Sequence, residues 1–314
     1  MPLLFTDARF LDHETDGHPE SADRLRAIDA MFAKCDLTDR FAVGDARRGT
    51  DEELGRVHTP AHIANIDRFA AAGGGRIEVD TIVSPASAEV ARLAAGTACA
   101  AVDAVLTTEY KRAFVVCRPP GHHALPDAPM GFCLFNNVAV AAAHARVAHG
   151  LDRVLIVDWD VHHGNGTQDA FYGDGQVTFF SSHRHPFYPG TGTRHETGAG
   201  QGLGATFNLT LPFGVSRKDF KSRFAAKLAD AADRSRPQLV LISAGFDAHA
   251  ADPVGSLSLE SEDFADFTRF VLDVANTHCG GKVVSLLEGG YNPAMLAESV
   301  GVHLREITAS HEGE

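Results

Sequence analysis

Five short apolar runs constrain the fold of this chain more than any other feature. They are AFVVC (113–117), VLIV (154–157), VTFFS (177–181), LVLIS (239–243) and VVSLL (283–287). Runs that are apolar at every position and rich in Val, Ile and Phe are typical of strands buried on both faces of a parallel sheet. Amphipathic segments of helical length lie near 134–149, 217–234, 260–278 and 293–309, and others lie near 21–34, 60–72 and 86–108. The alternation predicts an α/β fold with crossover helices.

The chain is expected to form a single domain over residues 1–314. That length allows one large domain or two medium ones. There is no internal repeat, low-complexity tract or linker, and the glycine-rich stretches 73–75 and 198–204 are expected to be loops within the domain.

Composition excludes several classes of protein. With 44% hydrophobic and 22% charged residues, the chain is neither disordered nor fibrous. It carries 28 Lys and Arg against 41 Asp and Glu, a net charge of −13. We therefore expect no nucleic-acid partner, because such a partner requires a basic surface.

The cysteines and the first residues indicate the expected compartment. The five cysteines form no CxxC pair and are expected to be buried apolar residues rather than disulfides or a thiolate zinc site. The first residues do not form a basic segment followed by an apolar one, as a signal peptide would. The sequence also contains no uncharged apolar stretch of ~18 residues. We expect a cytoplasmic protein with no membrane partner, and leave open whether it forms a homo-oligomer.

Polar loops follow all five predicted strands. They read RPPGHHA, DWDVHHGNG, SHRHPFYPGTG, AGFDAHAADP and EGGYN. Ligands of open parallel sheets bind beyond the carboxyl ends of the strands, so these loops are expected to meet at one edge. Seven of the 17 histidines are assigned to them: His122, His123, His162, His163, His183, His185 and His249.

One group of these side chains has the composition of a metal site. Asp158, Asp160 and His162 alternate, and an extended backbone through them would point all three to one side. Asp160, His162 and, as the third ligand, Asp247 would leave a position open, as in catalytic zinc sites. The oxygen-rich set also suits Fe²⁺, Co²⁺ or Mn²⁺. Alone, the DxD pattern is equally typical of a helix cap or a magnesium site.

Other loop residues offer acid, base and hydrogen-bond donors. His122 and His123 could exchange protons during amide hydrolysis, with Asp158 as the carboxylate partner of one of them. Tyr291 could donate a hydrogen bond to a developing oxyanion. Phe132 and Tyr188 could form the walls of a narrow slot. Taken singly, the histidines are better explained as a helix-capping pair and Tyr291 as an ordinary half-buried tyrosine, and core aromatics would look no different from Phe132 and Tyr188.

Together, the motifs resemble the zinc-dependent histone deacetylase family of the arginase-deacetylase superfamily. They are HPESADRL (18–25), RPPGHHA (118–124), GFCLFNN (131–137), VDWDVHHGNGTQDAF (157–171), FYPGTG (187–192), SAGFDAHAADP (243–253) and LEGGYN (287–292). The residues of these motifs are similar to those of class II enzymes and of their bacterial deacetylase-like and acetylpolyamine amidohydrolase relatives.

The resemblance implies roughly eight parallel strands flanked by helices, and it implies roles for particular residues. Zinc would be held by Asp160, His162 and Asp247. His123, beside Asn165, would be general base and acid, and His122 would be its electrostatic partner, oriented by Asp158. Tyr291 would polarise the scissile carbonyl. Asn165 stands where another branch of the family has Asp.

The resemblance also implies residues around the substrate. Those lining or bordering the acyl-lysine tunnel would be Phe132, Tyr188, Gly131, Gly289, Val254 and, at the rim, Asp80. Val254 stands where a polyamine-selective branch carries Glu. Structural potassium is expected at Asp158, Asp160, His162, Ser181 and Ser182, and Arg24 would lie near an internal acetate cavity.

The expected function is hydrolysis of an N-acetylated primary amine, such as acetyl-lysine or an acetylpolyamine, by metal-activated water. Two alternatives remain at this point. An arginase-like ureohydrolase would use two manganese ions and bridging carboxylates, and a non-catalytic module would only bind acyl-lysine.

Overall fold

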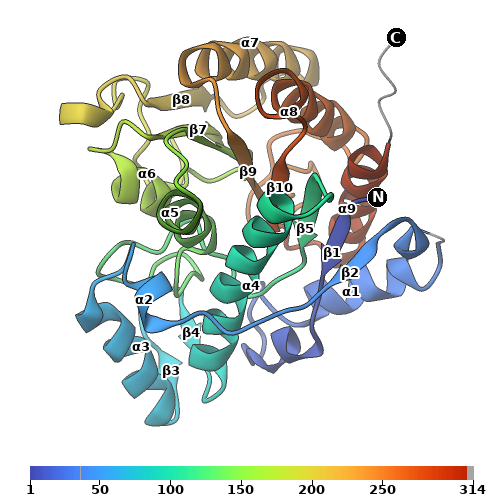
Figure 1. Cartoon of the computed structure of the whole chain (residues 1–314). Coiled ribbons are helices and arrows are strands. Elements are labelled where there is room, and N and C mark those ends of the chain that lie inside the picture. The colour runs from blue at the N-terminus through green and yellow to red at the C-terminus, as the bar shows by residue number, and fades with distance from the viewer. Residues whose placement is uncertain (36, 310–314) are drawn as a thin grey trace.

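The computed structural model describes residues 1–35 and 37–309. Its centre is a sheet of eight parallel strands in the order β2-β1-β5-β10-β9-β6-β7-β8 (Figure 1). The strands are β1 (Leu3–Phe5), β2 (Ala42–Gly44), β5 (Arg112–Val115), β6 (Val154–Asp158), β7 (Val177–Arg184), β8 (Thr206–Leu211), β9 (Leu239–Ala244) and β10 (Val283–Leu287). The predicted α/β fold with about eight parallel strands is confirmed.

Helices cover both faces of the sheet. They are α1 (Asp23–Phe32), α2 (Asp51–Leu54), α3 (Pro60–Ala71), α4 (Ser87–Thr107), α5 (Asn137–His149), α6 (Asn165–Phe171), α7 (Arg217–Ser235), α8 (Asp263–Cys279) and α9 (Pro293–Thr308). α4 and α5 pack on one face, and α7, α8 and α9 pack on the other, with α1 against α9 (Figure 1). Crossovers between parallel strands are right-handed as a rule, so connections that run in opposite directions along the sheet place their helices on opposite faces.

The strands that the sequence did not predict are either very short or alternate polar and apolar side chains. β1 and β2 have three residues each, and β8, TFNLTL, alternates polar and apolar side chains because it is an edge strand. A short antiparallel hairpin of β3 (Gly75–Arg76) and β4 (Ile82–Val83) was also not predicted.

Three local expectations were wrong. β6 ends at Asp158, so the extended strand does not continue to His162. His183 lies inside β7 rather than in the following loop. All five cysteines are free, but Cys35 is half-buried rather than buried.

One helix, α4, is long and apolar enough to cross a membrane by those two criteria alone. Of its most apolar window, 72% is buried inside the protein. Contacts with α5, β5 and β10 therefore account for its apolar composition.

The order of the strands determines where the candidate functional site lies. β5, β10, β9 and β6 are consecutive neighbours at the centre of the sheet. Because they are parallel, their carboxyl ends lie at the same edge, and the loops that leave them meet there.

Candidate metal centre and active site

The loops after β6 and β9 bring three ligand-type side chains together. Asp160, His162 and Asp247 offer ligand atoms that all lie within 4.8 Å of one another, and all three residues are buried. Nδ1 of His162 lies 3.0 Å from Oδ1 of Asp160 and 3.0 Å from Oδ2 of Asp247. The bend after Asp158 thus brings Asp160 and His162 to one centre without an extended strand.

The chemistry of this group fits a divalent cation. Oδ2 of Asp247 is buried and makes no well-directed hydrogen bond among the described residues, although Nδ1 of His162, another ligand-type atom, lies 3.0 Å from it. Burial, together with the charge of Asp160, raises the pKa of Asp247 to about 7. Two buried carboxylates beside one imidazole need a compensating positive charge. Two carboxylate oxygens and one imidazole nitrogen form a ligand set that suits zinc and harder divalent metals.

Backbone amides orient the two carboxylates. The N–H of Gly289 donates to Oδ2 of Asp160 at 2.9 Å, and the N–H of Val161 donates to Oδ1 of Asp247 at 2.8 Å. A Cβ atom at position 289 would collide with both carboxylates. Gly289 therefore allows the loop after β10 to pass directly over the metal centre.

The histidine pair lies beside this centre, and its two members have different partners. Nδ1 of His122 donates to Oδ2 of Asp158 at 2.9 Å. Nδ1 of His123 donates to Oδ1 of Asn165 at 2.7 Å. The rings are 4.0 Å apart between centroids, and each Nδ1 hydrogen bond leaves Nε2 on the other side of its ring.

Burial and neighbouring charges separate the protonation states of the pair. Burial alone would lower the pKa of His122, but Asp158 and Asp160 hold that pKa well above its ordinary value. Burial, followed by the positive charge of His122, lowers the pKa of His123 far below its ordinary value. His122 is therefore the cation of the pair, and His123 is the neutral imidazole that can accept a proton.

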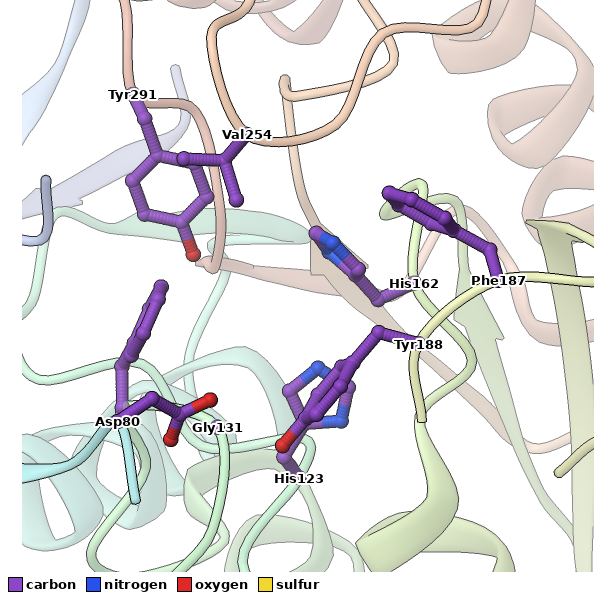
Figure 2. Close-up of a pocket in the computed structure, with 9 residues that line it drawn as sticks. Asp80, His123, Gly131, His162, Phe187, Tyr188, Val254 and Tyr291 are labelled. Atoms are coloured by element: carbon purple, nitrogen blue, oxygen red, sulfur yellow. The ribbon is translucent and has the colours of Figure 1, made fainter. Parts of the chain in front are cut away.

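A cavity of about 230 Å³ opens above the metal group. Its lining consists of Asp80, His123, Gly131, Phe132, His162, Phe187, Tyr188, Val254 and Tyr291. Figure 2 shows the hydroxyl group of Tyr291 directed into this cavity, opposite His123. The volume is below that of typical drug-sized sites, so the cavity suits a slender ligand.

Tyr291 is held as a hydrogen-bond donor. Burial, together with the charge of Asp160, raises the pKa of its phenol well above the ordinary value. Phe132 meets its ring edge to face at 5.5 Å, and Arg24 lies 5.1 Å from the ring centroid on the side of the protein interior. The phenol therefore stays protonated and keeps a defined orientation.

The mouth of the cavity is formed by segments far apart in the sequence. Asp80, beside the β3–β4 hairpin, is braced by Thr81, whose Oγ1 donates to Oδ1 of Asp80 at 3.0 Å and accepts the N–H of Phe132 at 3.1 Å. Tyr188 packs edge to face on His123 at 5.2 Å. Val254 lines the wall next to Tyr291 (Figure 2).

The serines expected near potassium lie on β7, next to β6. Ser181 pairs in register with Asp158, and its hydroxyl group hydrogen-bonds to His183 at 2.9 Å. The hydroxyl group of Ser182 is buried and has no partner among the described residues.

Two residues of the site were missed from the sequence. Phe187 stacks on His162, with 5.2 Å between ring centroids and an interplanar angle of 15°. Glu288 is buried and accepts the N–H of Gly121 at 2.7 Å and that of His122 at 3.2 Å. Phe187 lies in the motif FYPGTG and Glu288 in the motif LEGGYN. Their position next to predicted site residues was the one sequence feature that could have identified them.

Several known proteins are similar to this chain in sequence and in fold. A model of the histone deacetylase domain matches residues 18–307. The histone deacetylase-like amidohydrolase of Pseudomonas aeruginosa is 42% identical over 282 residues, covering 88% of this chain and 73% of that protein. The human polyamine deacetylase HDAC10 is 39% identical over 307 residues, covering 94% of this chain but 45% of that protein.

A solved structure agrees over nearly the whole chain. The crystal structure of the HDA15 HD domain superposes with a TM-score of 0.92 at 38% sequence identity, covering 99% of this chain and 91% of that one. Since the family model also spans every strand of the sheet except β1, together with the metal group and the histidine pair, the chain belongs to the histone deacetylase family.

Proposed function

We propose that this protein is a metal-dependent amidohydrolase that removes the acetyl group from an N-acetylated primary amine, such as acetyl-lysine or an acetylpolyamine. The observation that carries the proposal is the arrangement in one narrow cavity of a buried metal group, a neutral His123 and a protonated Tyr291. Family membership and the names of the relatives support the same reaction.

The metal group would be held by Asp160, His162 and Asp247. A divalent ion bound there lowers the pKa of a water molecule and polarises a carbonyl oxygen. Zinc is the ion we propose, and Fe²⁺, Co²⁺ and Mn²⁺ also suit the ligands.

His123 would move the protons of the reaction. Because its Nδ1 donates to Asn165, its Nε2 carries the lone pair. Nε2 accepts the proton of the attacking water and then delivers it to the departing amine. His122, held by Asp158, stays cationic and favours negative charge building up beside it.

Tyr291 would donate its phenolic hydrogen bond to the carbonyl oxygen as that oxygen becomes negative. Phe132, Phe187 and Tyr188 exclude water around the alkyl chain of the substrate. Asp80 at the mouth would accept hydrogen bonds from the part of the substrate that stays outside.

A structural potassium ion is a further part of the proposal. The unpartnered hydroxyl group of Ser182 supports it, together with Asp158, Asp160, His162 and Ser181 as the neighbouring ligand-bearing residues.

A binuclear ureohydrolase is less well supported. Two other groups of metal-ligand type occur among residues 1–35 and 37–309: Glu53 with Cys99 and His144, and Asp103 with His144 and His149. None of these residues lines the cavity. One transition metal per active chain, measured by elemental analysis, supports the deacetylase, whereas two metals in the active form would support the ureohydrolase.

The decisive experiment is a kinetic panel on zinc-loaded protein. Acetyl-lysine peptides, acetylated diamines and polyamines, and small aryl amides are compared by kcat/KM. Turnover of at least one acetylated alkylamine, lost on chelation and restored by zinc, is expected. A protein that binds an acetyl-lysine peptide without releasing acetate would be a binding module. Longer acyl chains belong in the panel, since Val254 presents a small apolar side chain to the cavity.

A further inference from the structure

A buried carboxylate beside the cavity takes no part in the reaction steps above. Asp252 lies in the loop between β9 and α8 and is 7% exposed. Its Oδ2 accepts the backbone N–H of Tyr291 at 2.6 Å, and its Oδ1 accepts the N–H groups of Val254 and Gly255 at 2.9 Å each. One side chain thus joins the backbone of the hydroxyl donor to the backbone of a cavity wall.

The peptide unit in front of Tyr291 is held from its other side as well. The C=O of Gly290 accepts a hydrogen bond from Nε of Arg24 at 2.6 Å. In a trans peptide the C=O and N–H groups point in opposite directions. Arg24 and Asp252 therefore fix the same peptide plane with two charge-assisted hydrogen bonds, which are the strong class of such bonds.

The sequence around this peptide explains why it needs fixing. Tyr291 follows two glycines, and Gly290 has φ +126°, a conformation that glycine adopts at little cost. Such a backbone has little stiffness of its own. A displacement of about 1 Å at a reacting group can cost ~100-fold in rate, so an untethered loop would weaken the contribution of the phenol.

We propose that Asp252 is a positioning residue that holds the hydroxyl group of Tyr291 at its place in the cavity and keeps Val254 in register with it. Asp252 is not among the described residues that line the cavity, so it acts through Tyr291. This inference rests on the proposed function, in which Tyr291 is the oxyanion donor.

The side chain must be a carboxylate to serve three N–H groups. An asparagine has one acceptor oxygen and an amino group that only donates. In Asp252→Asn the amino group must face either Tyr291 or the Val254–Gly255 pair, although the size of the side chain is unchanged.

A double-mutant cycle tests the proposal. The four proteins are the parent, Asp252→Asn, Tyr291→Phe and the double variant, all zinc-loaded and assayed on the best substrate of the panel. Asp252→Asn is expected to lower kcat by ~10- to 100-fold with KM and zinc content unchanged. In the Tyr291→Phe background the same change is expected to lower kcat by less than about 2-fold, because residues acting as one unit are not additive.

Controls separate positioning from folding. Glu260→Gln removes a carboxylate from the same loop that faces His249 at 3.7 Å, and it is expected to leave kcat unchanged. If Asp252→Asn does not give folded protein, Asp252→Glu replaces it in the cycle. It keeps both acceptor oxygens but places them one methylene group further from the backbone, so the same loss of kcat in the parent background, and not in the Tyr291→Phe background, is expected.

Two outcomes would overturn the inference. One is a loss of kcat by the same factor in both backgrounds, and the other is a parental kcat in Asp252→Asn. Either result leaves the proposed function intact, whereas a parent protein that turns over no acetylated amine contradicts the proposed function itself.

Discussion

Oδ1 of Asn165 lies 2.7 Å from Nδ1 of His123 and is its hydrogen-bond acceptor. The amide oxygen fixes the tautomer of the imidazole without adding a negative charge. The low pKa of His123 therefore follows from its burial and from the positive charge of His122, with no carboxylate at Nδ1 to oppose them.

Asn165→Asp is expected to change the pH dependence of the reaction. A carboxylate at Nδ1 raises the pKa of His123, which must be unprotonated to accept a proton from water. The acidic limb of the kcat/KM profile is therefore expected to move to higher pH by about one pH unit or more. Asn276→Asp, an exposed change of the same charge on α8, should leave the profile in place. An unchanged profile in Asn165→Asp would remove His123 from the role of base.

Tyr291→Phe is expected to lower kcat by ~100-fold or more with little change in KM, because the lost hydrogen bond acts on the transition state. Tyr110→Phe, a half-buried tyrosine away from the cavity, is the matched control and should behave as the parent. Steady-state kinetics on one acetylated amine checks both. Parental turnover in Tyr291→Phe would show that the phenol takes no part.

Gly289→Ala is expected to weaken metal binding. The added methyl group would occupy space next to Asp160 and Asp247, so their carboxylates would have to separate. Zinc titration with elemental analysis should show a loss of affinity of roughly 10-fold or more, the size of effect seen when groups that orient metal ligands are removed. Gly173→Ala, where an added Cβ meets nothing within 4 Å, should bind zinc as the parent does. Equal zinc affinity in both variants would contradict this assignment of the centre.

Glu20→Gln is expected to destabilise the fold by about 3–5 kcal/mol at pH 7, the usual cost of breaking a buried ion pair. Glu20 is buried and pairs with Arg118 at 2.5 Å and Arg24 at 3.1 Å. Burial would raise the pKa of Glu20, but the charge of Arg118 and the hydrogen bonds hold it well below its ordinary value of 4.5.

The sign of the pH effect follows from that lowered pKa. The stabilising contribution of Glu20 is complete above pH 4.5 and is lost as the pH falls toward the pKa of the folded state. Urea unfolding, followed by the fluorescence of the single tryptophan, should therefore show a difference between parent and variant that shrinks in acid. Glu298→Gln, an exposed change on α9, should show no difference at either pH. A gap between parent and Glu20→Gln that stays constant with pH would contradict the ion pair.

The sequence predicted the sheet and the site to different extents. Strands buried on both faces, such as β6 and β10, have continuous apolar runs and were found almost to the residue. β1, β2 and β8 are too short or too polar to be separated from loops by periodicity. The convergence of Asp160, His162 and Asp247 followed from parallel strands ending at one edge.

Other features of the site depend on geometry that no local pattern contains. Asp252 and Glu288 act through backbone N–H groups of distant loops, and their sequence neighbours do not identify those partners. The separation of the pKa values of His122 and His123 likewise depends on which carboxylate or amide reaches each ring. Spacing along the chain indicated only that Asp158 was available to one of the two imidazoles. The family resemblance implied His122, and Oδ2 of Asp158 lies 2.9 Å from Nδ1 of His122.

The position of β10 has a consequence for how the protein becomes active. This strand is the last of the eight in chain order, and it inserts between β5 and β9 at the middle of the sheet. A growing chain that has not yet made β10 would expose two unpaired strand edges and lack the loop that carries Gly289 and Tyr291. Completion of the sheet and assembly of the catalytic centre therefore both wait until β10 and the loop after it have been made, so no amino-terminal intermediate that lacks them is expected to hydrolyse substrate.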